Sequence, residues 1–358
     1  MRTSSGGSRR RAAAMTAVGL TAAVLVGVVS VPGAVAASST ASVGRLTVTQ
    51  VADRYAFSTP TAMAAYGGAL FVVNRGGNTV TEVNASTGAW LRTISAAVGK
   101  FSAPTAIVGY TVDLFVANRA GSLSELDART GRLLRVIAGS RYRFSSPTAL
   151  AVHGGDLWVL NAGGSVTEIV ARSGAWVRTI AGGKYAFNRP SAMVVAGGQA
   201  WVTNTHGNAV TEFDATSGAW IRTVTSPAYQ LKSPSGIAFD GTRIWVADYA
   251  TSTITVIVAA TGALSQVVST SSAGPESVAA GDSRVYVTSP DGYYPMLTAY
   301  SASSAGYQWM MCNSNGPYNF NNPQAPLVVG TVLWVANAAG NSLTEMDATS
   351  GAYLRTVA

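Results

Sequence analysis

A unit of about 43 residues recurs seven times along this chain and constrains its fold more than any other feature. In each unit a Pro precedes, by fourteen residues, the end of a short aromatic segment. These pairs are Pro60/Asn74, Pro104/Asn118, Pro147/Asn161, Pro190/Asn204, Pro234/Asp248, Pro275/Ser289 and Pro323/Asn337. The steps between successive Pro residues are 44, 43, 43, 44, 41 and 48 residues. Such a period is typical of repeat architectures, in which neighbouring units bury each other's faces.

Each unit predicts four short strands joined by turns. In the first unit we expect strands at 61–65, 70–73, 79–83 and 89–94, separated by segments rich in Gly, Asn and Ser/Thr. The second strand has an aromatic residue among aliphatic ones in every unit, which favours a strand. Pro has no N–H to donate and suits a strand's first residue. The sequence therefore predicts an all-β chain, a seven-bladed β-propeller of four-stranded antiparallel blades.

The spacing of charged residues tests the predicted pairing of the third and fourth strands of each unit. Five units place a Glu ten residues before an Arg, across the third turn, where an antiparallel hairpin brings them face to face. The pairs are Glu82/Arg92, Glu125/Arg135, Glu168/Arg178, Glu212/Arg222 and Glu345/Arg355. Both members change together in the fifth unit, to Val256/Gln266, and we align Tyr300/Met310 in the sixth. A role that recurs on five units indicates structural ion pairs rather than catalytic carboxylates.

The N-terminal region predicts export. Three consecutive arginines, 9–11, precede an apolar run at 15–31 and a small-residue site that ends at Ala36. This is the pattern of a secretory signal peptide, which we assign to 1–36, with cleavage favoured over an uncleaved membrane anchor. A weak twin-arginine pattern leaves Sec and Tat export both open. We expect 37–43 to be a flexible start and 44–358 to be the propeller, without a membrane span after cleavage.

A further strand candidate precedes the first Pro. Gly44-Arg45-Leu46 lies as far from Pro60 as Gly131-Arg132-Leu133 lies from Pro147. Residues 46–51 and 352–357 therefore compete for the outer place of the last blade, and the sequence does not decide between them.

Charge and cysteine content exclude some classes of protein. The formal charge is +8, but 1–36 contains four Arg and no acids, so the remainder has 20 bases against 16 acids, a net charge of +4. Because no dense Lys/Arg run follows the leader, nucleic-acid binding is not predicted. The single cysteine, Cys312, excludes an intrachain disulfide framework. We expect a monomer.

The repeat motif resembles known families. Its elements Pro-Ser/Thr-Ala, Thr-Val-Thr-Glu, Ser/Thr-Gly-Ala-Trp/Tyr and Arg-Thr-Ile/Val resemble NHL- and YVTN-type repeats of secreted bacterial propellers over 44–358. The chain is also distantly similar to virginiamycin B lyase-like propellers, seven-bladed metal-dependent enzymes that use His and Glu. That resemblance implies His153 or His206 beside carboxylates and a divalent ion. No His-x-Glu arrangement surrounds either histidine, so we assign no catalytic residue, metal or cofactor.

Aromatic and basic side chains in the loops that enter each unit predict a binding face. A Tyr stands five residues before the Pro in five units, and Arg54, Arg141 and Lys184 precede three of them. A Tyr face with nearby cations suits sugars or anionic polymers. The alternative is that each hydroxyl caps a neighbouring loop. We place other candidates in second-to-third strand loops and in an irregular loop of the sixth unit. The candidates are Tyr55, Arg75, Arg119, Tyr142, Tyr185, His206, Tyr229, Tyr249, Tyr293 and Tyr318.

These features together predict a secreted, non-catalytic binding module. Its expected ligand is a carbohydrate or an anionic cell-envelope polymer, or else a protein partner. Two alternatives stay open, a metal-dependent lyase-like enzyme and a structural extracellular component.

Overall fold

The computed structural model describes residues 54–358, apart from 226, 271–272, 291–294 and 314–315. The predicted signal peptide at 1–36, the segment 37–43, the strand candidate at 46–51 and Tyr293 lie outside the described residues.

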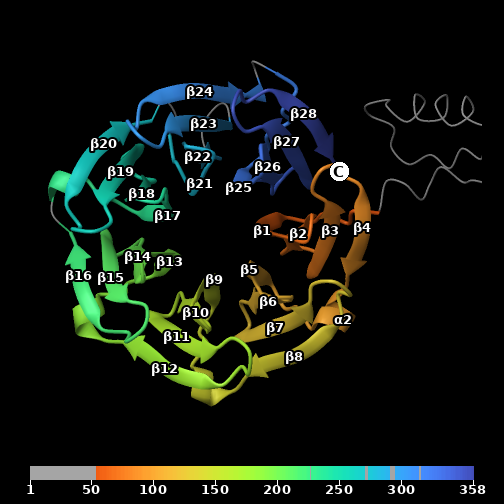
Figure 1. Cartoon of the computed structure of the whole chain (residues 1–358), viewed down its shortest axis with the longest axis horizontal. Helices are drawn as coiled ribbons and strands as arrows, with labels where there is room; N and C mark the ends of the chain where they lie inside the picture. Colours follow the sequence, from red (N-terminus) through yellow and green to blue (C-terminus); the bar gives the residue numbers. More distant parts are fainter. Residues whose placement is uncertain (1–53, 226, 271–272, 291–294, 314–315) are drawn as a thin grey trace, which may run out of the picture. The chain divides into compact units, whose positions relative to one another are not determined.

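Within 54–358 the strands form seven four-stranded antiparallel sheets arranged around an axis, as predicted (Figure 1). In each sheet the strands follow chain order from the axis outward, so the fold is a seven-bladed β-propeller. Blade 1 comprises β1 (Pro60–Tyr66), β2 (Ala69–Asn74), β3 (Thr79–Asn84) and β4 (Trp90–Ile94), and blade 2 comprises β5 (Pro104–Tyr110), β6 (Asp113–Asn118), β7 (Ser122–Asp127) and β8 (Leu133–Ala138). Blade 3 comprises β9 (Pro147–His153), β10 (Asp156–Asn161), β11 (Ser165–Val170) and β12 (Trp176–Ala181), and blade 4 comprises β13 (Pro190–Ala196), β14 (Gln199–Asn204), β15 (Ala209–Asp214) and β16 (Trp220–Val224). Blade 5 comprises β17 (Pro234–Phe239), β18 (Arg243–Asp248), β19 (Thr253–Val258) and β20 (Leu264–Ser269). Blade 6 comprises β21 (Ser277–Gly281), β22 (Arg284–Ser289), β23 (Met296–Ser301) and β24 (Tyr307–Cys312). Blade 7 comprises β25 (Pro323–Val329), β26 (Val332–Asn337), β27 (Ser342–Asp347) and β28 (Tyr353–Val357).

Four short helical turns that lie fully within the described residues occur in loops that connect one blade to the next. They are α2 (Ala96–Gly99), η2 (Ser140–Tyr142), η3 (Gly183–Tyr185) and η4 (Pro227–Tyr229). Among the described residues no helix is both long enough and apolar enough to span a membrane.

The predicted register of the two inner strands is confirmed in six blades. Pro60 pairs with Asn74 in blade 1, and the equivalent Pro opens the innermost strand of every blade except blade 6, where β21 begins at Ser277. In blades 1 to 3 the residue after the Pro is the extra residue of a β-bulge. A bulge re-aims a side chain, and these three residues, Thr61, Thr105 and Thr148, lie at the axis.

The hydrophobic core is divided among the seven interfaces between adjacent blades, which we call seams. Each of seven buried clusters combines strands of two neighbouring blades, for example Phe71 of blade 1 with Leu114 of blade 2. The aromatic residue of every second strand is at most 1% exposed. Because a single blade would leave both faces exposed to water, closing the ring buries them.

All five predicted Glu–Arg pairs face each other across the outer hairpin and form salt bridges. They are Glu82/Arg92, Glu125/Arg135, Glu168/Arg178, Glu212/Arg222 and Glu345/Arg355. In blade 3, Arg178 Nε lies 2.6 Å from Glu168 Oε2, and the glutamate side chain is 2% exposed. The same guanidinium donates to the carbonyls of Thr216 and Ser217 in the next blade. The arginine therefore neutralises a buried acid and also ties two blades together.

The sequence-based interpretation of Arg92 and Arg135 as partners within one hairpin is incomplete, and the structure corrects it. Arg92 Nη2 donates to the carbonyls of Ala128 and Arg129 in blade 2, at 3.0 and 2.9 Å. Arg135 Nη2 donates in the same way to Ala171 O of blade 3, at 3.2 Å. Spacing within one unit could not reveal these contacts, because the accepting carbonyls belong to the following unit.

The predicted alignment of the sixth unit is wrong by one residue. The pair at the Glu–Arg position is Ala299/Trp309, whereas Tyr300 is opposite Tyr307. Tyr300 is instead buried in the seam between blades 5 and 6. Trp309 Nε1 donates to Thr349 O of blade 7 at 3.0 Å, so this side chain also links its blade to the next.

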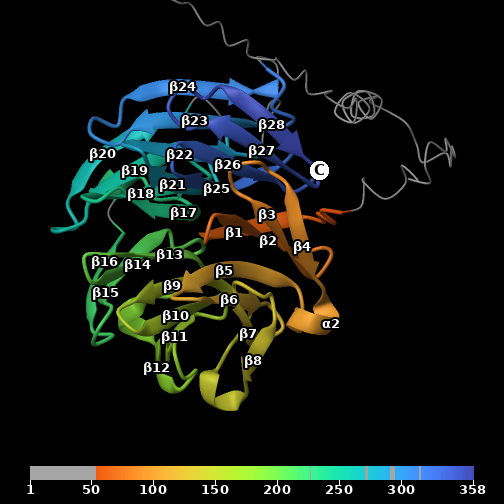
Figure 2. The same ribbon diagram turned by 45° about the vertical axis from the view of Figure 1, so that its right-hand side comes forward.

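Side chains close the ring between blades 7 and 1. The outer place of blade 7, left open by the sequence, is filled by β28. Trp334 and Val357 pack against Phe57 in this seam, and Arg355 donates to carbonyls of the turn between β3 and β4. Figure 2 shows the first and last blades side by side, and their innermost strands β1 and β25 are in contact, as are those of other neighbouring blades.

Candidate functional site at the axis of the propeller

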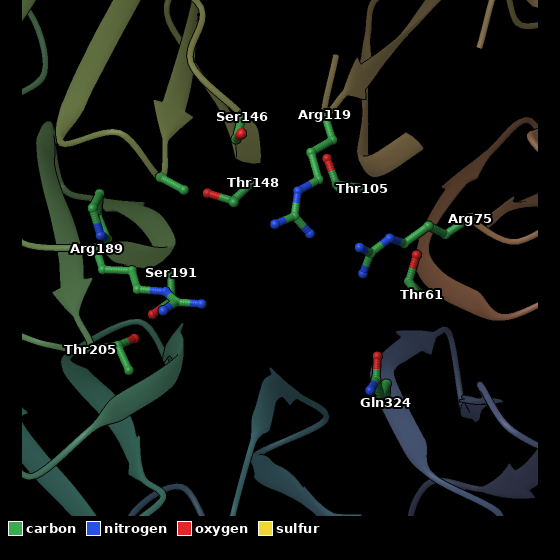
Figure 3. Close-up of a pocket in the computed structure, with 12 residues that line it drawn as sticks. Thr61, Arg75, Thr105, Arg119, Ser146, Thr148, Arg189, Ser191, Thr205 and Gln324 are labelled. Carbon is green, nitrogen blue, oxygen red and sulfur yellow. The ribbon is translucent and has the colours of Figure 1, made fainter. Parts of the chain in front are cut away.

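The innermost strands begin around a cavity on the axis, with a volume of about 320 Å³ (Figure 3). We call it the arginine cavity. It is lined by Thr61, Arg75, Thr105, Arg119, Ser146, Thr148, Ala162, Arg189, Pro190, Ser191, Thr205 and Gln324. These residues come from blades 1, 2, 3, 4 and 7, so the cavity exists only when the ring is assembled.

Hydroxyl groups on the wall follow from the repeat itself. The residue after each repeat Pro is Thr or Ser in blades 1 to 5, and the bulge beside it turns the side chain toward the axis. Several of these hydroxyls link blades: Thr105 donates to Pro147 O at 2.8 Å and Ser235 to Pro275 O at 3.1 Å. Thr61 Oγ1 is buried without a hydrogen-bond partner among the described residues. The wall is therefore rigid and polar.

Three arginine side chains converge in this cavity (Figure 3). Arg75 and Arg119 follow the second strands of blades 1 and 2, and Arg189 precedes Pro190 with a left-handed φ of 50°. All three are exposed, and within the described part of the chain none forms a salt bridge. No acidic residue is among the described residues that line the cavity. The cavity consequently concentrates positive charge against fixed hydroxyl groups, which suits an anion.

The arginines of the outer hairpins take no part in this convergence. Arg92 lies on β4 and Arg135 on β8, the outermost strands of their blades, and neither lines a cavity at the axis. Their guanidinium groups are occupied by Glu82 and Glu125. The chain therefore separates structural arginines on the outer strands from arginines at the axis that have no salt-bridge partner among the described residues.

A second cavity, of about 860 Å³, continues across the axis, and we call it the glutamate cavity. Its described lining is Arg189, Ser191, Thr205, His206, Ser233, Ser235, Tyr249, Glu276, Pro290, Pro295, Asn321, Asn322 and Gln324. Four of these residues, including Arg189, also line the arginine cavity. The two cavities are therefore adjoining parts of one mouth.

Among the described residues that line this mouth, Glu276 is the acidic one. It occupies, in blade 6, the place after the Pro that holds Thr or Ser in blades 1 to 5. Burial raises the pKa of its carboxyl group above the ordinary value. No described residue forms an ion pair with that carboxylate or hydrogen-bonds to it, although Arg189 lines the same cavity.

Five of the predicted tyrosines lie in the seams instead of lining either cavity. The hydroxyl of Tyr185 donates to Gly218 O at 2.7 Å, and four of the five rings stack on the Phe two residues later. We call this set the seam tyrosines; the hydroxyl–carbonyl pairs are Tyr55/Gly88, Tyr142/Gly174, Tyr185/Gly218, Tyr229/Gly262 and Tyr318/Gly351. This geometry agrees with the alternative that each hydroxyl caps a neighbouring turn.

Four other predicted residues do gather at the mouth. Arg75 and Arg119 line the arginine cavity, while His206 and Tyr249 line the glutamate cavity. His206 Nε2 lies 3.3 Å from a guanidinium nitrogen of Arg189. His153 lies elsewhere, because it ends β9 and Pro147 begins it on the cavity side. Among the described residues no three His, Cys, Asp or Glu side chains are grouped closely enough to hold a metal ion.

Comparisons with known proteins agree with the fold. A family model described as outer membrane protein assembly factor BamB matches residues 30–266 and 206–355. The chain belongs to this family. A search of curated proteins returned no match.

Solved structures of similar fold include lyases and a designed protein. A catalytically inactive variant of virginiamycin B lyase from Staphylococcus aureus, solved with quinupristin, has a TM-score of 0.67 and 15% identity, covering 83% of this chain and 96% of that one. A streptogramin B lyase has a TM-score of 0.65 and 14% identity, with 79% and 91% covered. The computationally designed Ika8 protein has a TM-score of 0.63 and 17% identity, with 84% and 87% covered. At these identities the likeness concerns the fold alone.

Sequence analysis missed Arg189, Glu276 and the hydroxyl groups of the wall. The available signal was the position after each repeat Pro, which reads Thr, Thr, Thr, Ser, Ser, Glu and Gln along the chain. A polar position that recurs beside a buried strand in every unit predicts a ring of side chains at the axis. Glu276 is the only charged member of that ring.

Proposed function

We propose that this BamB-family propeller is a secreted, non-catalytic binding module that captures anionic groups of a ligand in the arginine cavity. The convergence of three arginines that lack salt-bridge partners among the described residues carries this proposal. Guanidinium groups bind carboxylates and phosphates through paired, charge-assisted hydrogen bonds. The hydroxyls of Thr105 and Ser191 lie beside them but already donate to backbone carbonyls, so the arginines are the donors to a bound anion.

The source of the ligand follows from the predicted export of the chain. A secreted protein meets cell-envelope carbohydrates, anionic polymers and other exported proteins, and all three can present carboxylate or phosphate groups. The NHL- and YVTN-type character of the repeats is part of this proposal, because such repeats occur in secreted bacterial propellers. A monomer with one axial site would bind one ligand segment per ring.

Binding of soluble anionic polymers tests the proposal. Isothermal titration with a polyuronate and with a polyglycerol phosphate, against neutral dextran, should show saturable binding of at least one anionic polymer and none of dextran. Arg75→Gln with Arg119→Gln should weaken that binding about 100-fold, as expected for two lost charge-assisted contacts. Binding should also fall with salt, because surface charges are screened.

A seam tyrosine provides the matched control. Tyr185→Phe removes a hydroxyl that donates to Gly218 O, away from both cavities, and should leave the affinity unchanged. Equal affinity of wild type and the double arginine variant would contradict the arginine cavity as the site. Absence of saturable binding to any polymer or exported partner would favour the structural extracellular component.

One observation favours a second candidate, a lyase-like enzyme. His206 and Glu276 line the same cavity, which gives one base and one acid at the mouth. Three of the similar structures are lyases, and one of these was solved with quinupristin. Incubation of quinupristin with the protein and Mg²⁺, followed by mass spectrometry, tests this candidate. Cleavage that His206→Ala abolishes would establish it, whereas intact quinupristin agrees with the binding module.

A further inference from the structure

We propose, on the basis of the binding function above, that the ligand is an acidic peptide segment that also carries one ammonium group. Its carboxylates would occupy the arginine cavity and its ammonium group would lie beside Glu276. The inference goes beyond anion binding because it assigns a separate task to the glutamate cavity.

The two cavities can be spanned by one chain because they share part of their lining. Arg189, Ser191, Thr205 and Gln324 belong to both, so a ligand that leaves the arginine cavity enters the glutamate cavity directly. Their volumes, about 320 and 860 Å³, fall in the range of natural ligand sites.

The carboxylate of Glu276 gives the second cavity its specificity. A half-buried carboxylate is costly unless a cation or a hydrogen-bond donor compensates it. In the outer hairpins of this protein each buried glutamate has an arginine partner, as Glu168 has Arg178, whereas Glu276 has no partner of either kind among the described residues. A ligand ammonium group beside Glu276 would supply that partner. Tyr249, in the same lining, presents an aromatic ring, which also favours a cation.

The charges of the described lining residues set the balance of the ligand. Among these residues, three arginines line one cavity and one glutamate lines the other, so the complementary ligand has several carboxylates and one ammonium group. Between them, the hydroxyls of Ser191 and Thr205 and the amides of Asn321, Asn322 and Gln324 supply donors and acceptors. A peptide backbone alternates N–H and C=O groups and can match such a wall.

A matched pair of peptides tests this assignment. The probes are an acetylated peptide with two Glu, a spacer of two to four Gly and a C-terminal Lys amide, and the same peptide with Nε-acetyl-lysine. Acetylation removes the ammonium charge but keeps the chain. Titration of the wild-type protein should show about tenfold lower affinity for the Nε-acetyl-lysine probe than for the free-lysine probe at the best spacer length.

Glu276→Gln is the variant that isolates the glutamate cavity. Gln occupies the equivalent place in blade 7, so the substitution fits the ring, and circular dichroism with thermal unfolding checks that it folds. In this variant the two probes should bind equally, because the ammonium group has lost its partner. Arg75→Gln with Arg119→Gln should weaken both probes in parallel.

The outcomes separate the two proposals. Equal binding of both probes to wild type, or a persistent preference for free lysine in Glu276→Gln, would overturn the peptide proposal and leave the arginine cavity as an anion site. Tight binding of a polyuronate together with no binding of either peptide would also overturn it, in favour of a carbohydrate. If the wild-type protein bound neither peptide and none of the anionic polymers, the proposed function itself would be rejected.

Discussion

Blades 3 and 5 share one backbone arrangement but differ at the outer hairpin. In blade 3, Glu168 pairs with Arg178, and Arg178 donates to two carbonyls of the next blade. In blade 5, Val256 faces Gln266, and Gln266 Nε2 still donates to Ser304 O of the next blade at 3.2 Å. The comparison separates two roles, because the link between blades persists where the ion pair is absent.

The same two blades differ at the end of the second strand. In blade 3 the amide of Asn161 donates to Thr167 Oγ1, whose hydroxyl donates to Tyr142 O. In blade 5, Thr255 Oγ1 lies 2.6 Å from Asp248 Oδ2 and 2.7 Å from Tyr229 O. One hydroxyl has one proton and cannot donate to both oxygens. A protonated Asp248 would donate to Thr255 Oγ1, as the amide of Asn161 donates to Thr167 Oγ1 in blade 3. The hydroxyl of Thr255 could then donate to Tyr229 O.

The largest effect should come from breaking the blade 3 ion pair on one side only. Arg178→Met leaves Glu168 buried without its counter-charge and removes two donors to blade 4. We expect the free energy of unfolding to fall by about 3 kcal/mol, the lower end for buried pairs because the arginine side chain is 36% exposed. Chemical denaturation followed by tryptophan fluorescence measures it. Arg172→Met, at an exposed position of the same blade, is the control and should cost under about 0.5 kcal/mol.

A smaller, pH-dependent effect should follow from making blade 5 resemble blade 3. Burial raises the pKa of Asp248 to about 7, although hydrogen bonds from Thr255 and the backbone of Lys232 oppose the shift. The folded protein then retains a proton that the unfolded chain releases, so the wild type loses stability as pH rises from about 4 to about 7. Asp248→Asn has no such titration. It should match the wild type near pH 4 and exceed it by about 2 kcal/mol at pH 8, which is half of the roughly 4 kcal/mol that the rise in the pKa of Asp248 would give in a site unable to relax when the carboxyl group ionises.

Measuring this difference across the pH range can also contradict the prediction. In denaturation of the wild type and Asp248→Asn between pH 4 and 8, the difference in free energy of unfolding should grow up to about pH 7 and then level off. A difference that stays constant with pH would show that the aspartate is ionised throughout, and that blade 5 differs from blade 3 only in shape.

The smallest effect should come from giving blade 3 the two residues that blade 5 has at the Glu–Arg position. Glu168→Val with Arg178→Gln removes both charges together and keeps a donor toward blade 4. We expect a loss of about 1 kcal/mol or less, because replacing a buried pair as a unit leaves no uncompensated charge. Denaturation under the conditions used for Arg178→Met measures it. A loss as large as that of the single variant would mean that glutamine cannot replace arginine as the link.

Most of the fold could be predicted because the repeat supplies the same evidence many times. The pairing of Pro60 with Asn74 and of Glu168 with Arg178 follows from spacing alone. The prediction is wrong in blade 6, where a changed unit length shifts the alignment by one residue. Because side chains alternate between the faces of a strand, this shift exchanges Ala299 for the buried Tyr300.

Contacts between units were outside the reach of that spacing argument. The sequence places Arg92 opposite Glu82 and Arg135 opposite Glu125, and the structure has both pairs. It also has each guanidinium donating to backbone carbonyls of the following blade, as Arg92 does to Ala128 O. A repeat period specifies what one blade contains, whereas these contacts depend on how closely two blades approach.

The site was harder to predict, for a geometric reason. Spacing identified the loops that carry Arg75 and Tyr185, but it could not say which way either side chain turns. Arg75 reaches the axis, whereas Tyr185 lies back in a seam with 8% of its surface exposed. Arg189 and Glu276 are 87 residues apart in sequence, and they share a cavity only because the ring closes.

The first and last blades are joined by packing and hydrogen bonds, and among the described residues blade 7 consists of its own strands β25 to β28. The junction between them is thus of the same kind as the six that the polypeptide crosses. Circular permutants with new termini in any blade-to-blade connection should therefore assemble the same axial mouth. The linear order in which the blades are encoded is separable from their cyclic order in the protein.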